Sequence, residues 1–354
     1  MMDMATKQKI DTFVTNWENA NETFAQDFSG IISVSGKDGI IYEKVRGFRN
    51  RGEGLPNEPT TAFATASVGK LFTAVAICQL VDQGKLTLEA KIKDILPHNL
   101  GTIDAETTVI HLLTHSSGIA DYLEFKDRES KEKFFDAHPV NKWTSNEFYI
   151  PLFNNLPSKF ALGSKADYSN SNFILLGLVI EAISKEGYHD YIMQNIIKPL
   201  GMERTGFYAT NNLPANTAIG YAWDAQINEF VGNHFRLPVV GAADGGIYTT
   251  ATDMRLFWDG LFQEKLFSKS ILDEFLTPRM VFDDIDGHFG LGIFVSEICG
   301  ETIYWHDGSD YGVSSHTAYF SSTGNVMTMF SNAAIKVMDF NNGLMALLAA
   351  KDGI

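Results

Sequence analysis

The chain carries an S-x-x-K sequence, Ser67-Val-Gly-Lys70, in a context that suits nucleophilic chemistry. Ser67 precedes an almost wholly apolar run, 71–81, which predicts a buried helix with Ser67 and Lys70 one turn apart on the same side. A serine hydroxyl is a poor nucleophile until a base takes its proton, and burial lowers the pKa of a lysine enough for it to be that base. The Ser67 amide, at the positive end of the helix, can also donate to a developing oxyanion.

The S-x-x-K sequence alone does not establish a site. A second copy, Ser130-Lys-Glu-Lys133, lies in a run of charges typical of a solvated face, and a capping serine with a snorkelling lysine gives the same pattern. Two further motifs are Tyr168-Ser169-Asn170, between a loop and an apolar helix, and His306-Asp307-Gly308, on a strand. Taken singly, the first is compatible with a turn and the second with a satisfied core histidine.

Other common catalytic and metal-binding patterns are missing. The sequence has neither G-x-x-x-x-G-K nor G-x-S-x-G. His111 and His115 have the spacing of a zinc-binding helix face, but the glutamate of that motif and a third ligand are missing, so we interpret them as a histidine pair at a helix end. The acidic run 283–287 is too irregular for a calcium loop. We therefore expect no metal and no cofactor.

Hydrophobic periodicity predicts a sheet built from both ends of the chain, which would hold these motifs in place. A helix over 6–26 and two strands come first, and four strands and a last helix over 338–350 follow Gly245-Gly246. The expected strands are 28–35, 40–48, 289–298, 301–305, 314–320 and 325–330. The expected helices between them are 67–83, 86–96, 107–115, 145–155, 171–186 and 188–199.

This order of elements predicts an α/β (α+β) fold, in which helices from the two termini flank an antiparallel sheet and a mostly helical region is inserted. We expect one discontinuous domain from 1–65 and 240–354, and a helical domain from 66–239. The active site would lie at their interface.

Composition and charge exclude several classes of function. The 354 residues are 45% hydrophobic, which excludes disorder, and include 28 Lys and Arg against 43 Asp and Glu, for a net charge of −15. Without a basic cluster, such a chain predicts no nucleic-acid partner. The longest apolar run, 173–180, is far shorter than the ~20 residues that span a bilayer, and the N-terminus is polar. We expect no membrane association and a cytoplasmic address for the sequence as given, or an extracytoplasmic one if a leader was removed; the oligomeric state is not predicted.

Together and in this order, the three motifs resemble those of the serine β-lactamase and penicillin-binding-protein superfamily. The similarity is to its branch of class C β-lactamases and D-alanyl-D-alanine carboxypeptidases, which also includes esterases and D-aminopeptidases. It covers nearly the whole chain and extends to the segments 111–118, 199–202 and 245–251. The resemblance implies the β-lactamase/transpeptidase-like fold expected above.

The resemblance also implies roles for four residues. Ser67 would be the acylated nucleophile and Lys70 its activating base. Tyr168 would share proton transfer, as a base or as the acid that serves the leaving group, with Lys70 depressing its pKa. Asn170 would hold the substrate amide and orient Lys70.

The third motif would bind the substrate and departs from the commoner Lys-Thr-Gly. Gly308 would let substrate lie along the strand edge, and the amides of Ser67 and Ser309 would form the oxyanion hole. His306 replaces a permanent cation by a group that is mostly neutral near pH 7. Asp307 replaces a hydroxyl that helps to bind a carboxylate, so it would repel an anion, unless it points away or is paired, and could accept an ammonium or a neutral ester.

The sequence therefore favours a serine hydrolase that acts through an acyl-serine intermediate on an ester, amide or D-amino-acid peptide bond of a small molecule or peptide. One alternative is a D-alanyl-D-alanine carboxypeptidase, a penicillin-binding protein or a weak β-lactamase. Another is a catalytically silent binding or sensor module on the same fold.

Overall fold

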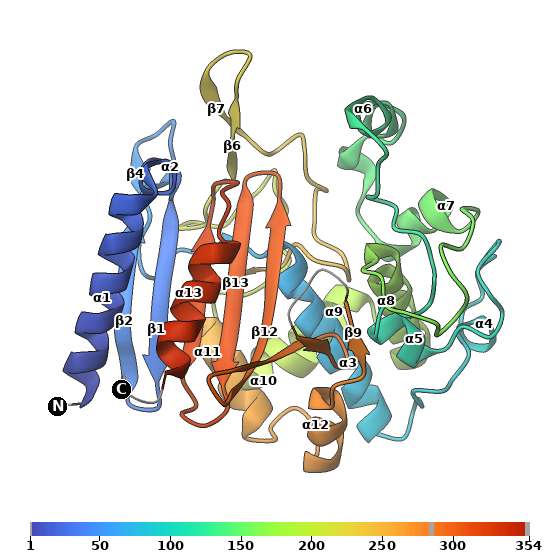
Figure 1. The fold of residues 1–354 in the computed structure, drawn as a ribbon. Coiled ribbons are helices and arrows are strands. Elements are labelled where there is room, and N and C mark those ends of the chain that lie inside the picture. The colour runs from blue at the N-terminus through green and yellow to red at the C-terminus, as the bar shows by residue number, and fades with distance from the viewer. Residues whose placement is uncertain (1, 283–286, 351–354) are drawn as a thin grey trace.

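The computed structural model describes residues 2–282 and 287–350, so nearly all of the acidic run 283–287 lies outside the described residues. An eight-stranded sheet with the order β2-β1-β14-β13-β12-β11-β10-β9 dominates the fold, and every neighbouring pair in it is antiparallel (Figure 1). Its strands are β1 (Gly30–Gly36), β2 (Gly39–Arg46), β9 (Met280–Val281), β10 (His288–Phe289), β11 (Phe294–Ile298), β12 (Glu301–Asp310), β13 (Val313–Phe320) and β14 (Val326–Ser331). The pairing of β1 with β14 joins the two ends of the chain, and the predicted fold class is confirmed.

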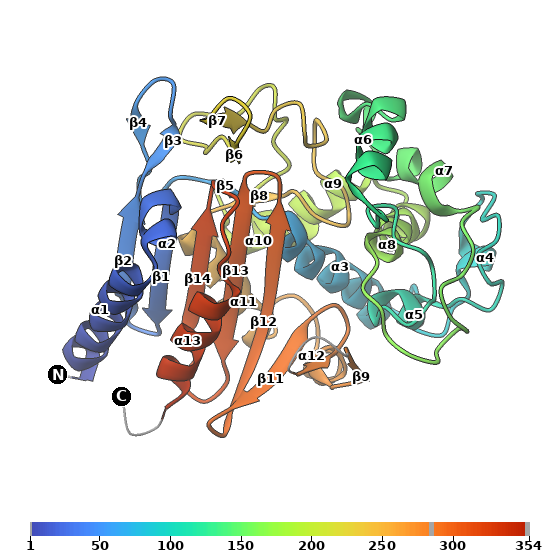
Figure 2. The same ribbon diagram turned by 45° about the horizontal axis from the view of Figure 1, so that its top comes forward.

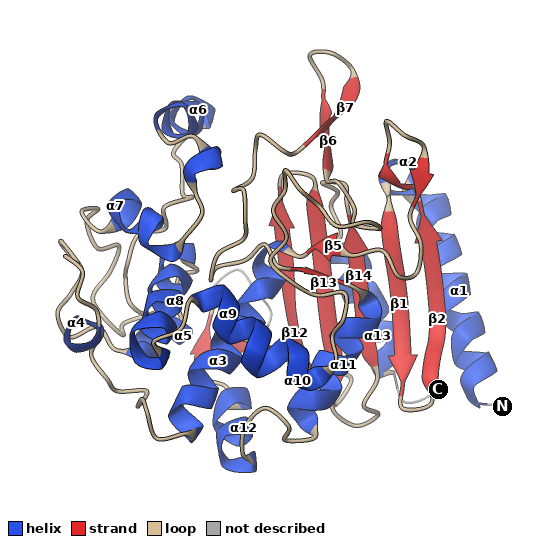
Figure 3. Ribbon diagram, turned by 180° about the vertical axis from the view of Figure 1, so that it is seen from behind, coloured by secondary structure: helices blue, strands red, loops and turns tan. Residues whose placement is uncertain are grey.

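Helices cover both faces of this sheet. The terminal helices α1 (Met2–Ala20) and α13 (Met338–Ala349) lie on one face, and α11 (Ala251–Phe262) lies on the other (Figures 1 and 3). Side chains alternate between the faces, as a strand requires: Ile32 joins the core under α1 and α13, whereas Ile31 joins the larger core on the opposite side. Because β1 is covered on both faces, it carries apolar residues at successive positions, such as Ile31 and Ile32.

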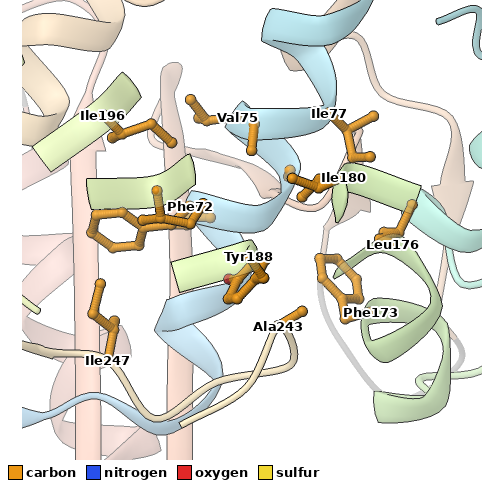
Figure 4. Packing of buried hydrophobic residues seen from close by; sticks show 14 of the residues in the cluster. Phe72, Val75, Ile77, Phe173, Leu176, Ile180, Tyr188, Ile196, Ala243 and Ile247 are labelled. Carbon is orange, nitrogen blue, oxygen red and sulfur yellow. The ribbon is translucent and has the colours of Figure 1, made fainter. Parts of the chain in front are cut away.

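A mostly helical region packs beside the sheet (Figure 2). At its centre is α3 (Lys70–Asp82), apolar on every side, which contacts α8 (Asn170–Ser184), α9 (Tyr188–Ile192) and α12 (Lys269–Leu276). Figure 4 shows Ile77 of this helix on the side of Leu176 and Ile180 of α8. The remaining helical elements are α2 (Glu22–Asp27), η1 (Ala66–Gly69), α4 (Ile92–Ile95), α5 (Val109–Leu113), α6 (Arg128–Ala137), η2 (Val140–Lys142), η3 (Asn146–Tyr149), α7 (Ile150–Phe153), the π-helical η4 (Met193–Ile197) and α10 (Lys198–Leu200).

Three two-stranded sheets complete the fold. They pair β3 (Phe48–Asn50) with β4 (Leu55–Pro56), β5 (Phe63–Ala64) with β8 (Tyr248–Thr249), and β6 (Tyr221–Asp224) with β7 (Glu229–Gly232). The hairpin of β6 and β7 projects from the body in Figure 1 and lies within the region expected to be helical. The boundaries between the two expected domains stay a prediction.

Several expected elements differ from the observed ones for local reasons. The helix predicted over 6–26 is broken at Asn21, whose side-chain and backbone N–H groups both donate to the carbonyl of Trp17 and end α1. The helix predicted over 86–96 shrinks to α4, because the backbone of Leu88 and Ala90 accepts from residues 109–110 in place of a helical ladder. The helices α11 and α12 were not predicted.

The packing of Phe72 gives a direct test of this core. Phe72 is fully buried, with its ring centroid 4.7 Å from that of Phe257 in α11. We expect Phe72→Ala to lower the free energy of unfolding by about 3–5 kcal/mol, because it removes a buried aromatic ring and leaves a cavity. Urea denaturation measures this change. The matched control is Phe235→Ala at a side chain that is 90% exposed, where the change should stay within about 0.5 kcal/mol.

Candidate active site

The local backbone holds Ser67 in a tight turn and not, as expected, in the first turn of an α-helix. Ser67 lies in the 3₁₀ turn η1, and the preceding Ala66 has φ of 45°, a left-handed conformation that is uncommon for a residue with a Cβ. The loop that contains Gly245 fixes this turn, because the amide of Gly246 donates to the carbonyl of Ala66 at 3.1 Å. A Cβ on Gly245 would lie 2.5 Å from that carbonyl oxygen, so only glycine permits the approach.

Lys70 is the first residue of α3, and its side chain is fully buried. Its Nζ donates to the Ser67 Oγ at 3.0 Å, to the Asn170 Oδ1 at 2.7 Å and to the backbone carbonyl of Asp244 at 2.5 Å. Burial lowers the pKa of Lys70 to about 8, and nearby carboxylates, first Asp244 and then Asp121, oppose a larger fall. Lys70 is therefore a buried amine that can lose its proton near neutral pH.

Tyr168 comes just before α8 and brings a phenol to the same point. The Ser67 side chain is near enough to the phenol to act on its pKa, and the Lys70 Nζ lies 5.0 Å from the centroid of its ring. Burial raises the pKa of Tyr168 well above 10 and outweighs the opposite effect of Ser67. The expected depression by Lys70 is therefore wrong in direction: Tyr168 is a protonated phenol at neutral pH.

Asn170, the first residue of α8, is oriented by a carboxylate. Its Nδ2 donates to the Asp121 Oδ2 at 2.9 Å. Because the Asp121 oxygen accepts this bond from the Nδ2, the Oδ1 of the same amide is left to face Lys70. The structure thus places Asn170 where it can orient the lysine amine.

The third motif lies on β12, at an edge of the sheet. Its neighbour β11 pairs with β12 only as far as Trp305, so the following residues have no strand on that side. His306 is fully buried, its Nδ1 lies 2.6 Å from the carbonyl of Asp307, and burial lowers its pKa to about 3. His306 is therefore neutral at pH 7, with Nδ1 as the donor and Nε2 left as an acceptor.

Gly308 lies directly against the turn that holds the nucleophile. A Cβ on Gly308 would lie 2.3 Å from the carbonyl oxygen of Thr65 and 2.8 Å from the amide nitrogen of Ser67. Contacts this short are forbidden between real atoms. The absence of a side chain at Gly308 is what lets β12 approach Ser67.

The two acidic residues of this edge lie on opposite faces of β12, because side chains alternate along a strand. Asp310 shares the face of Gly308 and lines a cavity of about 150 Å³ that also contains Ser67, Asn170 and Ser309. Asp307 projects to the other face, opposite His316, and does not line this cavity. Burial raises the pKa of Asp307.

The structure also brings in residues that sequence reasoning did not select. His115 stacks on Tyr168 with ring centroids 4.4 Å apart, and its Nδ1 accepts from the amide of Ser169 at 3.1 Å. The carboxylate of Asp244 accepts a 2.5 Å bond from the phenol of Tyr122. His115 belongs to the segment 111–118, which carried the resemblance without an assigned role, whereas Asp244 lies just before the segment 245–251. No group of three or more His, Cys, Asp or Glu side chains among the described residues could hold a metal ion.

The fold and this geometry define a serine that is hydrogen-bonded by a buried lysine, at the junction between an antiparallel sheet and a helical region. The family model described as Beta-lactamase matches residues 9–350, so the chain belongs to the Beta-lactamase family of serine hydrolases. Within residues 2–282 and 287–350, no helix is both long and apolar enough to cross a membrane.

Relatives and solved structures agree with this membership. The chain is 27% identical over 349 residues to the putative penicillin-binding protein PbpX of Bacillus subtilis, which covers 97% of this chain and 81% of the relative. A penicillin-binding protein from Bacillus halodurans has a TM-score of 0.84 and 33% identity, with 95% and 98% of the two chains covered. A D-amino acid amidase from Ochrobactrum anthropi has a TM-score of 0.78 over 99% of both chains but only 20% identity, so it shows similarity of fold alone.

The close approach of β12 to Ser67 predicts a strong effect of one added methyl group. Gly308→Ala should lower the free energy of unfolding by about 1–3 kcal/mol, because β12 must move away from the turn. It should also slow the labelling of Ser67 by a fluorophosphonate by at least about tenfold, since a misplaced oxyanion donor costs that much or more. Urea denaturation and intact-protein mass spectrometry measure the two effects.

The matched control is Gly52→Ala, at an ordinary backbone angle where the nearest neighbouring atom would be 3.6 Å from the new Cβ. It should leave both stability and labelling unchanged. Equal behaviour of the two variants would contradict the packing described here.

Proposed function

We propose that the protein hydrolyses ester or amide bonds, including those of D-amino-acid derivatives, through an acyl-serine intermediate on Ser67. The hydrogen bonds of Lys70 carry the proposal. When the amine is neutral, its two N–H groups can be held by the Asn170 Oδ1 and the carbonyl of Asp244, which only accept. Its lone pair is then left to face the Ser67 hydroxyl, as general-base catalysis requires.

In acylation, the Ser67 Oγ attacks the substrate carbonyl carbon as its proton passes to Lys70. The amides of Ser67 and Ser309 would donate to the oxyanion. The bond to the leaving group then breaks as that group takes a proton from the Tyr168 phenol, and Lys70 returns its proton to the phenol. A protonated Tyr168 suits the role of acid better than that of base. Water then attacks the acyl carbon as Lys70, neutral again, takes its proton. The bond from that carbon to the Ser67 Oγ breaks, Lys70 passes the proton to the Oγ, and the acid leaves.

The substrate class rests on the charges at the site. His306 is neutral at pH 7, so it lacks the permanent positive charge that a lysine would offer to a substrate carboxylate. This favours an ester, an amide or a D-amino-acid peptide over a β-lactam. The D-amino acid amidase neighbour has the same fold and acts on substrates of this class, as its name says.

A second candidate is a penicillin-binding protein that acts on peptides ending in D-alanyl-D-alanine, or a weak β-lactamase. The names of the Bacillus relatives favour it. A catalytically silent binding module is less well supported, because the Lys70 amine and the Tyr168 phenol both contact the Ser67 hydroxyl.

The test is to incubate the protein separately with a p-nitrophenyl ester, a fluorescent penicillin and a peptide ending in D-Ala-D-Ala. Ester turnover with only slow penicillin labelling is expected, and Ser67→Ala should abolish both, because no other nucleophile contacts Lys70 among the described residues. Absorbance and intact mass are the readouts.

The matched control is Ser130→Ala, in the second S-x-x-K copy. Ser130 is half-buried on α6, and its hydrogen bonds go only to Asp127 at the start of that helix, so turnover should be unchanged. Adducts that persist in Ser67→Ala would remove Ser67 as the nucleophile, and release of D-Ala would select the second candidate.

The pKa of Lys70 predicts the pH dependence of acylation. Below about pH 8 the amine is protonated and cannot accept the Ser67 proton, so the rate should rise roughly tenfold per pH unit and level off above pH 8. His306 is already neutral and Tyr168 still protonated in this range, so neither adds a step. Stopped-flow labelling with a neutral ester between pH 5.5 and 9.5 measures the profile; a flat profile would exclude Lys70 as the base.

A further inference from the structure

The free edge of β12 ends in a carboxylate that faces the nucleophile. Gly308 meets the Ser67 turn, and the side chain two residues further along a strand leaves on the same face. Asp310 therefore projects toward the cavity, which it lines together with Ser67. Asp307, which the sequence favoured as the residue that tunes substrate choice, projects to the opposite face.

The Asp310 carboxylate is ionised and incompletely paired. Its Oδ1 accepts from the amide of Tyr311 at 2.7 Å, and it makes no ion pair within the described residues. Asp310 is an exposed residue at the end of β12, so solvent reaches its carboxylate. Desolvation and then the charge of Asp244 raise its pKa to about 6, while the Tyr311 amide and the charges of Lys131 and Lys70 oppose the rise, so it carries a charge at pH 7. Asp244 differs, because its own carboxylate is engaged by the phenol of Tyr122.

The rest of the cavity is largely apolar. Aromatic and aliphatic side chains form its walls, namely Leu123, Phe135, Trp143, Tyr149 and Leu237. A cavity of about 150 Å³ with such walls is of the size that accepts a benzene ring. An apolar side chain of a substrate would fit there, beside the carboxylate.

We propose that Asp310 binds the free ammonium of the acyl part of the substrate, so that the protein prefers amides or esters of unblocked amino acids with an apolar side chain. The position of the carbonyl rests on the proposed function: it would lie between the amides of Ser67 and Ser309. Asp310 follows Ser309 along β12, and one residue of a strand spans only about 3.3 Å. An ammonium on the carbon next to the substrate carbonyl would therefore lie within reach of the Asp310 carboxylate.

Arg236 is the opposing charge in this cavity. Its guanidinium lies 5.5 Å from the centroid of the Tyr311 ring and makes no ion pair among the described residues, so it would attract an anionic ligand. On the cavity side of β12, the carboxylates of Asp244, Asp121 and Asp310 act on Lys70. Lys131 is a further positive charge that acts on Asp310. Among these carboxylates, Asp310 lines the cavity at the free end of β12, where an ammonium can approach it.

The test measures binding without turnover. Isothermal titration calorimetry at pH 7 of the Ser67→Ala variant compares D-phenylalaninamide with the neutral 3-phenylpropionamide and the anionic 3-phenylpropionate, which share its skeleton. The ammonium compound should bind at least about tenfold more tightly than the neutral one, as a charged hydrogen bond implies, and the anion most weakly.

Adding the Asp310→Asn substitution to the Ser67→Ala variant should abolish its preference for the ammonium compound, whereas adding Asp310→Glu should retain part of that preference. The matched control, Glu229→Gln at an exposed carboxylate of β7 outside the cavity, should leave the preference unchanged. Circular dichroism verifies that each variant is folded.

Four outcomes would overturn the proposal: equal affinities, no saturable binding, tighter binding of 3-phenylpropionate, or a preference that survives Asp310→Asn. Because the Ser67→Ala variant cannot be acylated, these results are independent of whether the wild-type protein forms an acyl-serine. The absence of any adduct on the wild-type protein would remove the proposed hydrolysis and leave the binding result standing.

Discussion

A lysine side chain with no exposed surface governs the arrangement of this protein. An ammonium taken out of water carries a large desolvation penalty, which is tolerable only when hydrogen-bond acceptors replace the lost solvent. Lys70 receives them from Ser67, Asn170 and the carbonyl of Asp244, which come from three distant segments. The turn at Gly245, the start of α8 and the start of α3 must therefore all meet at this nitrogen for the fold to be stable.

The neutral imidazole of His306 alters the electrostatics around the Lys70 amine. A second buried cation here would repel Lys70 and lower its pKa further. With a neutral imidazole, the ammonium of Lys70 faces carboxylates without a competitor, and its pKa remains near the physiological range. A neutral imidazole also attracts anionic ligands less than a lysine would, so on the proposed mechanism this one residue would affect both the base and the choice of substrate.

Much of the site could be predicted because its residues lie in short local patterns. The apolar run after Ser67 indicated that Lys70 is buried, and the motifs at Tyr168 and His306 identified the other two contributors. The sheet formed from both ends followed from short strand-like runs at the two termini, separated by residues typical of turns. These features depend on neighbours in sequence, which a single sequence displays.

What escaped prediction depends on contacts between distant residues. Asp121 and Tyr122 contribute through Asn170 and Asp244, and no local pattern marks such pairs. The direction of the Tyr168 pKa shift was wrong because the extent of burial is a tertiary property. The choice between Asp307 and Asp310 required the face of β12 that packs on Ser67, which is set by the packing of Gly308.

The pairing of β1 with β14 has a consequence for how the protein folds. The side chain of Ser331 donates to the carbonyl of Ser29, 302 positions away along the chain. Contacts of such sequence separation form slowly, because closing a long loop costs entropy before the contact is gained. β1 can pair with β14 only after residues 326–331 have been synthesised, so the large sheet that carries β12 is completed late relative to the helices that surround Lys70.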